Sequence, residues 1–120
     1  MTQLEQAIES AKILSDKKAR KVSVLKIGEI SSLADYMVIA TGNNSTHVKS
    51  LADELEFQLK GMGVNVDHIE GHRSDSWILL DYTDVIVHIF SDEAREYYNL
   101  DHLWLDGEQV DLTPYISVEE

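Results

Sequence analysis

The five histidines and 22 carboxylates of this 120-residue chain are the side chains that could support acid–base or metal chemistry. His68 and His72 are four residues apart, but Gly71 lies between them after an expected strand, so they do not share a helical face. The chain has no H-E-x-x-H motif, and it has no cysteine to supply thiolate ligands or disulfides. We therefore predict no metal site, no cofactor and no catalytic residue.

The segment Gly42 to Ser45 lies between an expected strand and an expected helix, where backbone N–H groups can bind phosphate. It lacks the glycine patterns of nucleotide-binding loops, and a turn with a helix cap explains it more simply. Nucleotidyl transfer also needs carboxylates two residues apart on a strand to hold its metal ions. Asp81 and Asp84 are three apart across a turn, whereas Asp106 and Glu108 lie in a turn-like tail. An enzyme of the nucleotidyltransferase or phosphohydrolase class, using residues 42–45, stays the alternative interpretation.

Residues 74–90 form the most informative segment, two apolar strands joined by a short acidic turn. Trp77 begins the first strand, and the turn holds Tyr82 between Asp81 and Asp84. Tryptophan and tyrosine often anchor protein interfaces. If Trp77 and Tyr82 share an exposed face, they form an aromatic centre with an acidic rim. The simpler alternative is that Trp77 is a core residue, as a tryptophan at the start of a strand usually is.

The net charge of −12 is concentrated in the second half of the chain. Residues 1–60 contain 8 Lys/Arg and 8 Asp/Glu, whereas residues 61–120 contain 2 and 14. Because nucleic-acid binding depends on Lys and Arg, we expect no direct nucleic-acid binding from the acidic half, which should attract a basic protein instead. Solubility alone would also explain an acidic surface. The chain lacks a long apolar run and a secretory pattern at its start, so we expect a cytoplasmic protein that does not enter membranes.

Hydrophobic periodicity predicts an α/β fold of the mixed α+β kind, a single mixed five-stranded sheet flanked by helices. Thr2 and Glu5 have the spacing of a capping box, and Asn44 or Ser45 is expected to cap the second helix. Residues 36–69 are expected to form a β-α-β unit with a parallel crossover. We place a domain at residues 1–105 and an acidic C-terminal tail at 106–120. The helices are expected at 3–18, 45–62 and 92–100, and the strands at 22–27, 36–41, 64–69, 77–80 and 85–90.

Five segments of the chain form a specific set, in order and without large gaps between residues 4 and 105. These segments are Asp35-Tyr36-Met37-Val38-Ile39-Ala40-Thr41-Gly42, Ser45-x-His47-Val48, Glu70-Gly71, residues 77–90 and Leu103-Trp104. Taken together, they resemble the ribosomal silencing factor family, RsfS or Iojap. In the turn between the two aspartates, where family members commonly have glycine, this chain has Thr83.

The resemblance implies a nucleotidyltransferase-like fold without the catalytic residues, and a role that is not enzymatic. It implies binding to the large ribosomal subunit through ribosomal protein uL fourteen, which sterically blocks joining of the small subunit and represses translation. A part in large-subunit biogenesis is also implied. The residues expected to contact the ribosomal protein are Trp77, Asp81, Tyr82 and Asp84. A homodimeric adaptor that buries the hairpin against its own copy stays a further alternative.

Overall fold

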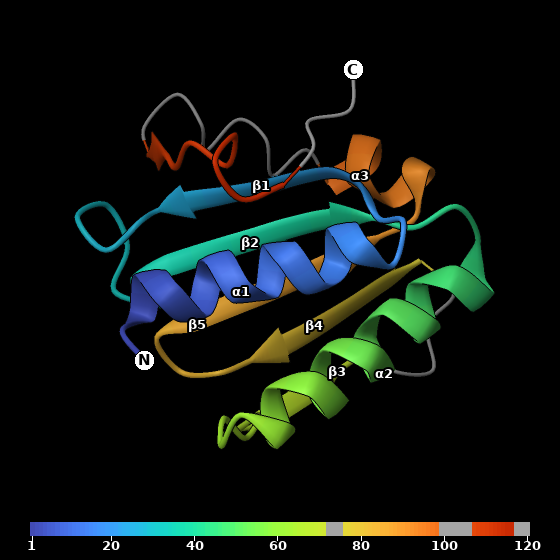
Figure 1. The fold of residues 1–120 in the computed structure, drawn as a ribbon. Helices are drawn as coiled ribbons and strands as arrows, with labels where there is room; N and C mark the ends of the chain where they lie inside the picture. Colours follow the sequence, from blue (N-terminus) through green and yellow to red (C-terminus); the bar gives the residue numbers. More distant parts are fainter. Residues whose placement is uncertain (72–75, 99–106, 117–120) are drawn as a thin grey trace.

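The structure is a computed structural model that describes residues 1–71, 76–98 and 107–116. Its centre is one six-stranded mixed sheet in the order β3-β4-β5-β2-β1-β6 (Figure 1). Strands β2 and β5 are parallel, and every other neighbouring pair is antiparallel. The strands are β1 (Arg20–Lys26), β2 (Tyr36–Thr41), β3 (His68–Glu70), β4 (Trp77–Asp81), β5 (Val85–Phe90) and β6 (Glu108–Gln109), and the helices are α1 (Gln3–Asp16), α2 (Ser45–Gly61) and α3 (Asp92–Tyr98).

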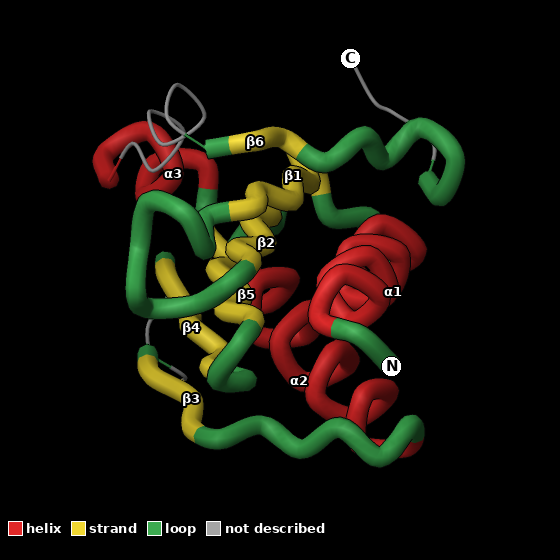
Figure 2. The backbone as a smooth tube through the Cα atoms, turned by 90° about the vertical axis from the view of Figure 1, so that its left-hand side faces the viewer, coloured by secondary structure: helices red, strands yellow, loops and turns green. Residues whose placement is uncertain are grey.

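The two long helices cover one face of the sheet. Figure 2 shows α1 and α2 together on one side, and α3 and the loop between β1 and β2 on the other. We call this second side the outer face and residues 27–35 the β1–β2 loop. Both faces of the sheet contribute side chains to the core. The larger core cluster lies under α1 and α2, and a smaller one lies on the outer face. None of the helices in the described ranges combines the length and apolar composition of a membrane span.

Local signals in the sequence set the starts of the helices. Thr2 Oγ1 accepts the Glu5 N–H at 3.1 Å, and the Glu5 carboxylate accepts the Thr2 N–H at 2.8 Å, which confirms the capping box. These bonds lower the pKa of Glu5. Asn44 caps α2 by accepting the His47 N–H at 2.8 Å. Ser91 caps α3 by accepting the Ala94 N–H at 3.2 Å.

The predicted element order and mixed sheet are confirmed, but the five-stranded count is wrong because residues of the tail add β6 beside β1. Strand β3 begins at His68 rather than at Val64, whose N–H instead bonds to the carbonyl of Leu59 at the end of α2. The helix expected at 45–62 ends one residue earlier, because Met62 follows the last helical turn of α2 and is 46% exposed. The β2-α2-β3 crossover connects two parallel strands, as predicted. These strands are not neighbours, because β4 and β5 lie between them in the sheet.

The tail after residue 106 lies against the sheet in its described part. The Val110 N–H bonds to the Val24 carbonyl at 2.9 Å, and Leu112 is buried in the core cluster under the helices. These contacts cover the free edge of β1, which would otherwise offer unpaired backbone groups to other chains. Residues 107–116 are therefore part of the packed structure. The predicted third helix beyond Tyr98 and the Leu103-Trp104 motif lie outside the described residues.

Candidate protein-docking site

The pairing of β3, β4 and β5 decides which side chains share the outer face. Ile78 and Leu80 of β4 are fully buried under the helices, so the alternating residues Trp77, Leu79 and Asp81 face the other way. Cross-strand partners lie on the same face of an antiparallel pair. The outer face therefore carries three rows, Trp77 beside Phe90, Glu70 beside Leu79 and His88, and His68 beside Asp81 and Ile86.

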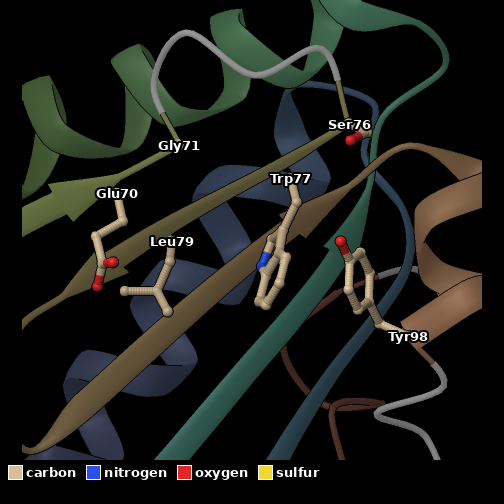
Figure 3. A pocket seen from close by; sticks show the side chains of 6 residues that line it. All are labelled: Glu70, Gly71, Ser76, Trp77, Leu79 and Tyr98. Carbon is tan, nitrogen blue, oxygen red and sulfur yellow. The ribbon is translucent and has the colours of Figure 1, made fainter.

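A groove of about 300 Å³ opens on this face. We call it the Trp77 groove, and Figure 3 shows the Trp77 ring in its middle, with Tyr98 from α3 on one side and Leu79 and Glu70 on the other. Its volume is at the lower end of small-molecule pockets, enough for one or two side chains of a partner. The groove is lined by Glu70, Gly71, Ser76, Trp77, Leu79 and Tyr98.

The half-buried Trp77 ring is held in place by aromatic neighbours. Its centroid lies 4.5 Å from that of Tyr98 and 5.3 Å from that of Phe90. The indole Nε1–H donates to Nδ1 of His88 at 3.0 Å, so this nitrogen of His88 carries no proton. Burial lowers the pKa of His88 to about 4, which keeps the imidazole neutral at pH 7. Trp77 thus presents a preorganised apolar surface.

Gly71 lets the end of β3 approach β4 beside the groove. Its φ is +76°, and a Cβ at this position would lie 2.3 Å from the carbonyl oxygen of Trp77. Both features require glycine, since a side chain would collide with backbone and would strain the left-handed conformation. The Glu70-Gly71 pair noted in the sequence therefore fixes Glu70 at the rim of the Trp77 groove.

Tyr82 does not share a face with Trp77, so its interpretation as an exposed anchor is wrong. The two residues are five apart, and this odd spacing turns Tyr82 toward the helices, where it is only 7% exposed. Burial and the charge of Glu56 raise the pKa of Tyr82 to about 12, and its hydroxyl has no hydrogen-bond partner in the described parts of the chain. Tyr98, which is 44% exposed, occupies the place beside Trp77.

Asp81 and Asp84, the two aspartates of the hairpin, form hydrogen bonds that hold the turn and also present carboxylates to solvent. Asp81 Oδ1 accepts the Thr83 N–H at 2.7 Å, while 24% of the Asp81 side chain stays exposed on the outer face. Asp84 is exposed in the turn, and its carbonyl accepts the N–H groups of Asp35 and Tyr36 at 2.9 and 3.1 Å. Thr83 between them has a φ of +75°. The turn therefore places both carboxylates at the end of β4 away from Trp77.

His68 lies among three carboxylates at the edge of the outer face. Its Nε2 is 3.1 Å from Glu70, and its Nδ1 is 3.6 Å from both Asp67 and Asp81. The hydrogen bond with Glu70 raises the pKa of His68, and the nearby carboxylates of Asp67 and Asp81 act in the same direction. The Asp67, His68 and Asp81 ligand atoms lie within 4.8 Å of one another, close enough for a divalent cation, but all three residues are partly or fully exposed. The absence of a metal site stays a prediction.

The segment at residues 42–45, considered above as a phosphate-binding loop, has polar groups that hydrogen-bond to α2. The Asn43 N–H bonds to Nδ1 of His47 at 2.9 Å, and the His47 N–H bonds to the Asn44 side chain. Arg20, the cation beside this loop, donates to Asn43 at 2.7 Å and to Asp92 at 2.6 Å, which lowers the pKa of Asp92. Asp92 also lines the pocket of about 360 Å³ at this loop and would repel a phosphate. These contacts argue against the enzymatic alternative.

A small mixed α/β domain with an aromatic groove that has a carboxylate, Glu70, at its rim is typical of a protein-docking module. Comparison with known proteins identifies the family. The sequence profile described as "Ribosomal silencing factor during starvation" matches residues 1–120. The chain therefore belongs to the ribosomal silencing factor family, as the sequence motifs indicated.

Individual relatives agree with this assignment. The chain is 38% identical over 104 residues to the "Ribosomal silencing factor RsfS" of Halalkalibacterium halodurans, covering 87% of this chain and 89% of that protein. A crystal structure of a Chromobacterium violaceum protein superposes with a TM-score of 0.84 at 33% identity, covering 92% of both chains. The mouse "Mitochondrial assembly of ribosomal large subunit protein 1" is 28% identical over 95 residues, 77% of this chain and 42% of that protein.

Proposed function

We propose that this protein binds the large ribosomal subunit through ribosomal protein uL fourteen and thereby blocks joining of the small subunit. Membership in the ribosomal silencing factor family supports a role at the ribosome. The mouse relative is named for assembly of the large ribosomal subunit, which supports that subunit as the target and a part in its biogenesis. Repression of translation then follows from occupancy alone, so the protein needs no catalytic chemistry.

The observation that carries the proposal is the Trp77 groove with Glu70 at its rim and Asp81 further along the same face. Trp77 and Tyr98 offer apolar surface that is already ordered, which reduces the entropy lost on binding. Glu70 and Asp81 offer negative charge at the same face, where Lys or Arg of a ribosomal protein would pair with them. The buried Tyr82 has no part in this contact, whereas Trp77, Asp81 and Asp84 keep the contact role implied by the resemblance.

The proposal is tested by co-sedimentation of the protein with purified large subunits over a range of concentrations. Trp77→Ala should weaken binding about 30-fold, the equivalent of about 2 kcal/mol for a truncated aromatic anchor. Because Trp77 also packs on Phe90, thermal unfolding must first confirm that the variant is folded at the assay temperature.

Charge is tested separately, with a matched control. Glu70→Lys reverses a side chain that is 68% exposed at the groove, and it should weaken binding most at low salt. Asp16→Lys makes the same charge change at the exposed end of α1, on the helix side of the sheet, and should leave the affinity within twofold. A folded Trp77→Ala protein with wild-type affinity would show that the groove is not the docking site.

A further inference from the structure

The Trp77 groove alone is too small for a stable protein interface. A groove of about 300 Å³ holds one or two side chains, whereas stable complexes bury about 800 Å² on each partner. Strand β4 leads from the groove to the turn at residues 82–84, and its five residues span about 17 Å. A partner that fills the groove and covers this strand would therefore reach the elements beside the turn.

The β1–β2 loop lies beside this turn and exposes two large apolar side chains. Leu33 is 74% exposed and Ile30 is 46% exposed. The loop is attached to the turn because the Asp35 N–H bonds to the Asp84 carbonyl at 2.9 Å. Figure 2 shows the loop on the side of the sheet away from α1 and α2, which is the side that carries the Trp77 groove.

The loop displays these side chains from an ordered backbone. Ile27 and Ala34, at its two ends, are buried in the core cluster of the outer face. The Ser31 N–H bonds to the Ile27 carbonyl at 2.8 Å, and the Leu33 N–H bonds to Oγ of Ser31 at 3.1 Å. These contacts hold the loop backbone, so Leu33 is already exposed in a fixed position before binding. An apolar surface that is ordered in advance loses less entropy on binding.

The charges around the loop indicate the chemistry of the partner. Glu29 and Asp35 are exposed in the loop and Asp84 is exposed in the turn attached to it, whereas Lys26 is exposed at the end of β1. A second copy of this chain would bring carboxylates against carboxylates, which is unfavourable. A basic protein surface with an apolar depression complements both the leucine and its acidic surroundings.

We propose that Leu33 and Ile30 of the β1–β2 loop form a second contact of the docking surface and insert into an apolar depression on the same basic protein that fills the Trp77 groove. This inference rests on the proposed function and adds to it the second half of the interface. The β4 strand and its turn separate the two contacts, so their losses should be nearly additive.

The test compares two variants, each of which replaces an apolar side chain with serine. The two replaced side chains are equally exposed. Leu33→Ser removes the apolar side chain from the loop, and Phe57→Ser removes one that is also 74% exposed but lies on α2, on the other side of the sheet. Leu33→Ser should weaken co-sedimentation with large subunits at least tenfold, and Phe57→Ser should change it less than twofold. Both variants should unfold at the wild-type temperature, because both side chains are 74% exposed.

The outcomes separate this inference from the proposed function. If wild-type protein binds, Trp77→Ala weakens binding and Leu33→Ser does not, the second contact is wrong and the groove stands. If wild-type protein fails to bind large subunits, both proposals are overturned. If Leu33→Ser converts a dimer of the free protein to a monomer while affinity for large subunits is unchanged, the loop is a self-association surface and the inference is also wrong.

Discussion

Thr83 is held in a backbone conformation that suits glycine, so Thr83→Gly should stabilise the protein. Its φ of +75° lies in the left-handed region, where a residue with a side chain loses roughly 1–2 kcal/mol. The Asp84 N–H bonds to the Tyr82 carbonyl at 3.0 Å across Thr83, which closes a tight turn around this residue. Glycine removes the strain but loses about 0.5–1 kcal/mol more conformational entropy on folding. The expected net gain is about 0.5–1 kcal/mol, or about 2–4 °C in the midpoint for a domain of this size.

Thr113 provides a matched control for this substitution. Its N–H donates to Oδ1 of Asp111 at 3.0 Å, as the Thr83 N–H donates to Oδ1 of Asp81, but its φ is not positive. Thr113→Gly also removes the hydrogen bond that the Thr113 hydroxyl donates to Asp111 at 2.6 Å, so it should destabilise the protein by about 1 kcal/mol or more. Urea unfolding and differential scanning calorimetry on both variants measure the difference. A Thr83→Gly protein that is no more stable than wild type would refute the claim that this turn stores strain.

Three further predictions concern buried polar side chains. His88 has a folded-state pKa of about 4, below its ordinary 6.5, so the unfolded chain takes up a proton on this residue first as the pH falls. The free energy of unfolding should therefore fall by about 3 kcal/mol between pH 6.5 and 4. Unfolding of His88→Gln should lack this part of the pH dependence. Tyr82→Phe should change stability by less than about 0.5 kcal/mol and leave subunit binding unchanged, because it removes a hydroxyl without a described hydrogen-bond partner. Arg95→Met should cost about 2 kcal/mol in urea unfolding, since the buried guanidinium donates to the Lys21 carbonyl and to Thr41.

The elements that local chemistry specifies were predicted well from the sequence. The Thr2 capping box, the Asn44 cap and the apolar strand at residues 36–41 each depend on contacts within a few residues, and each is confirmed. The hairpin from Trp77 to Phe90 is confirmed for the same reason. Periodicity misplaced the start of β3, since Val64 and Val66 alternate like a strand but the chain there closes the end of α2.

Features that depend on distant contacts were not predicted. Strand β6 forms only because the tail returns to the edge of β1, and no pattern in Glu108 and Gln109 indicates this. Tyr98 joins Trp77 because α3 folds back over the outer face, a tertiary placement that local periodicity does not encode. The error over Tyr82 was avoidable, because its odd spacing from Trp77 already places the two on opposite faces of an extended strand.

We propose that occupancy of the large subunit by this protein prevents the small subunit from joining. The most direct measurement mixes purified large and small subunits at fixed magnesium with increasing protein and resolves the particles by density-gradient sedimentation. Joined ribosomes should decrease as protein increases, and the protein should co-migrate with free large subunits only. Trp77→Ala should shift the effect to at least tenfold higher concentration. Undiminished joining at saturating protein, or protein found on joined ribosomes, would show that the protein does not act by blocking subunit joining.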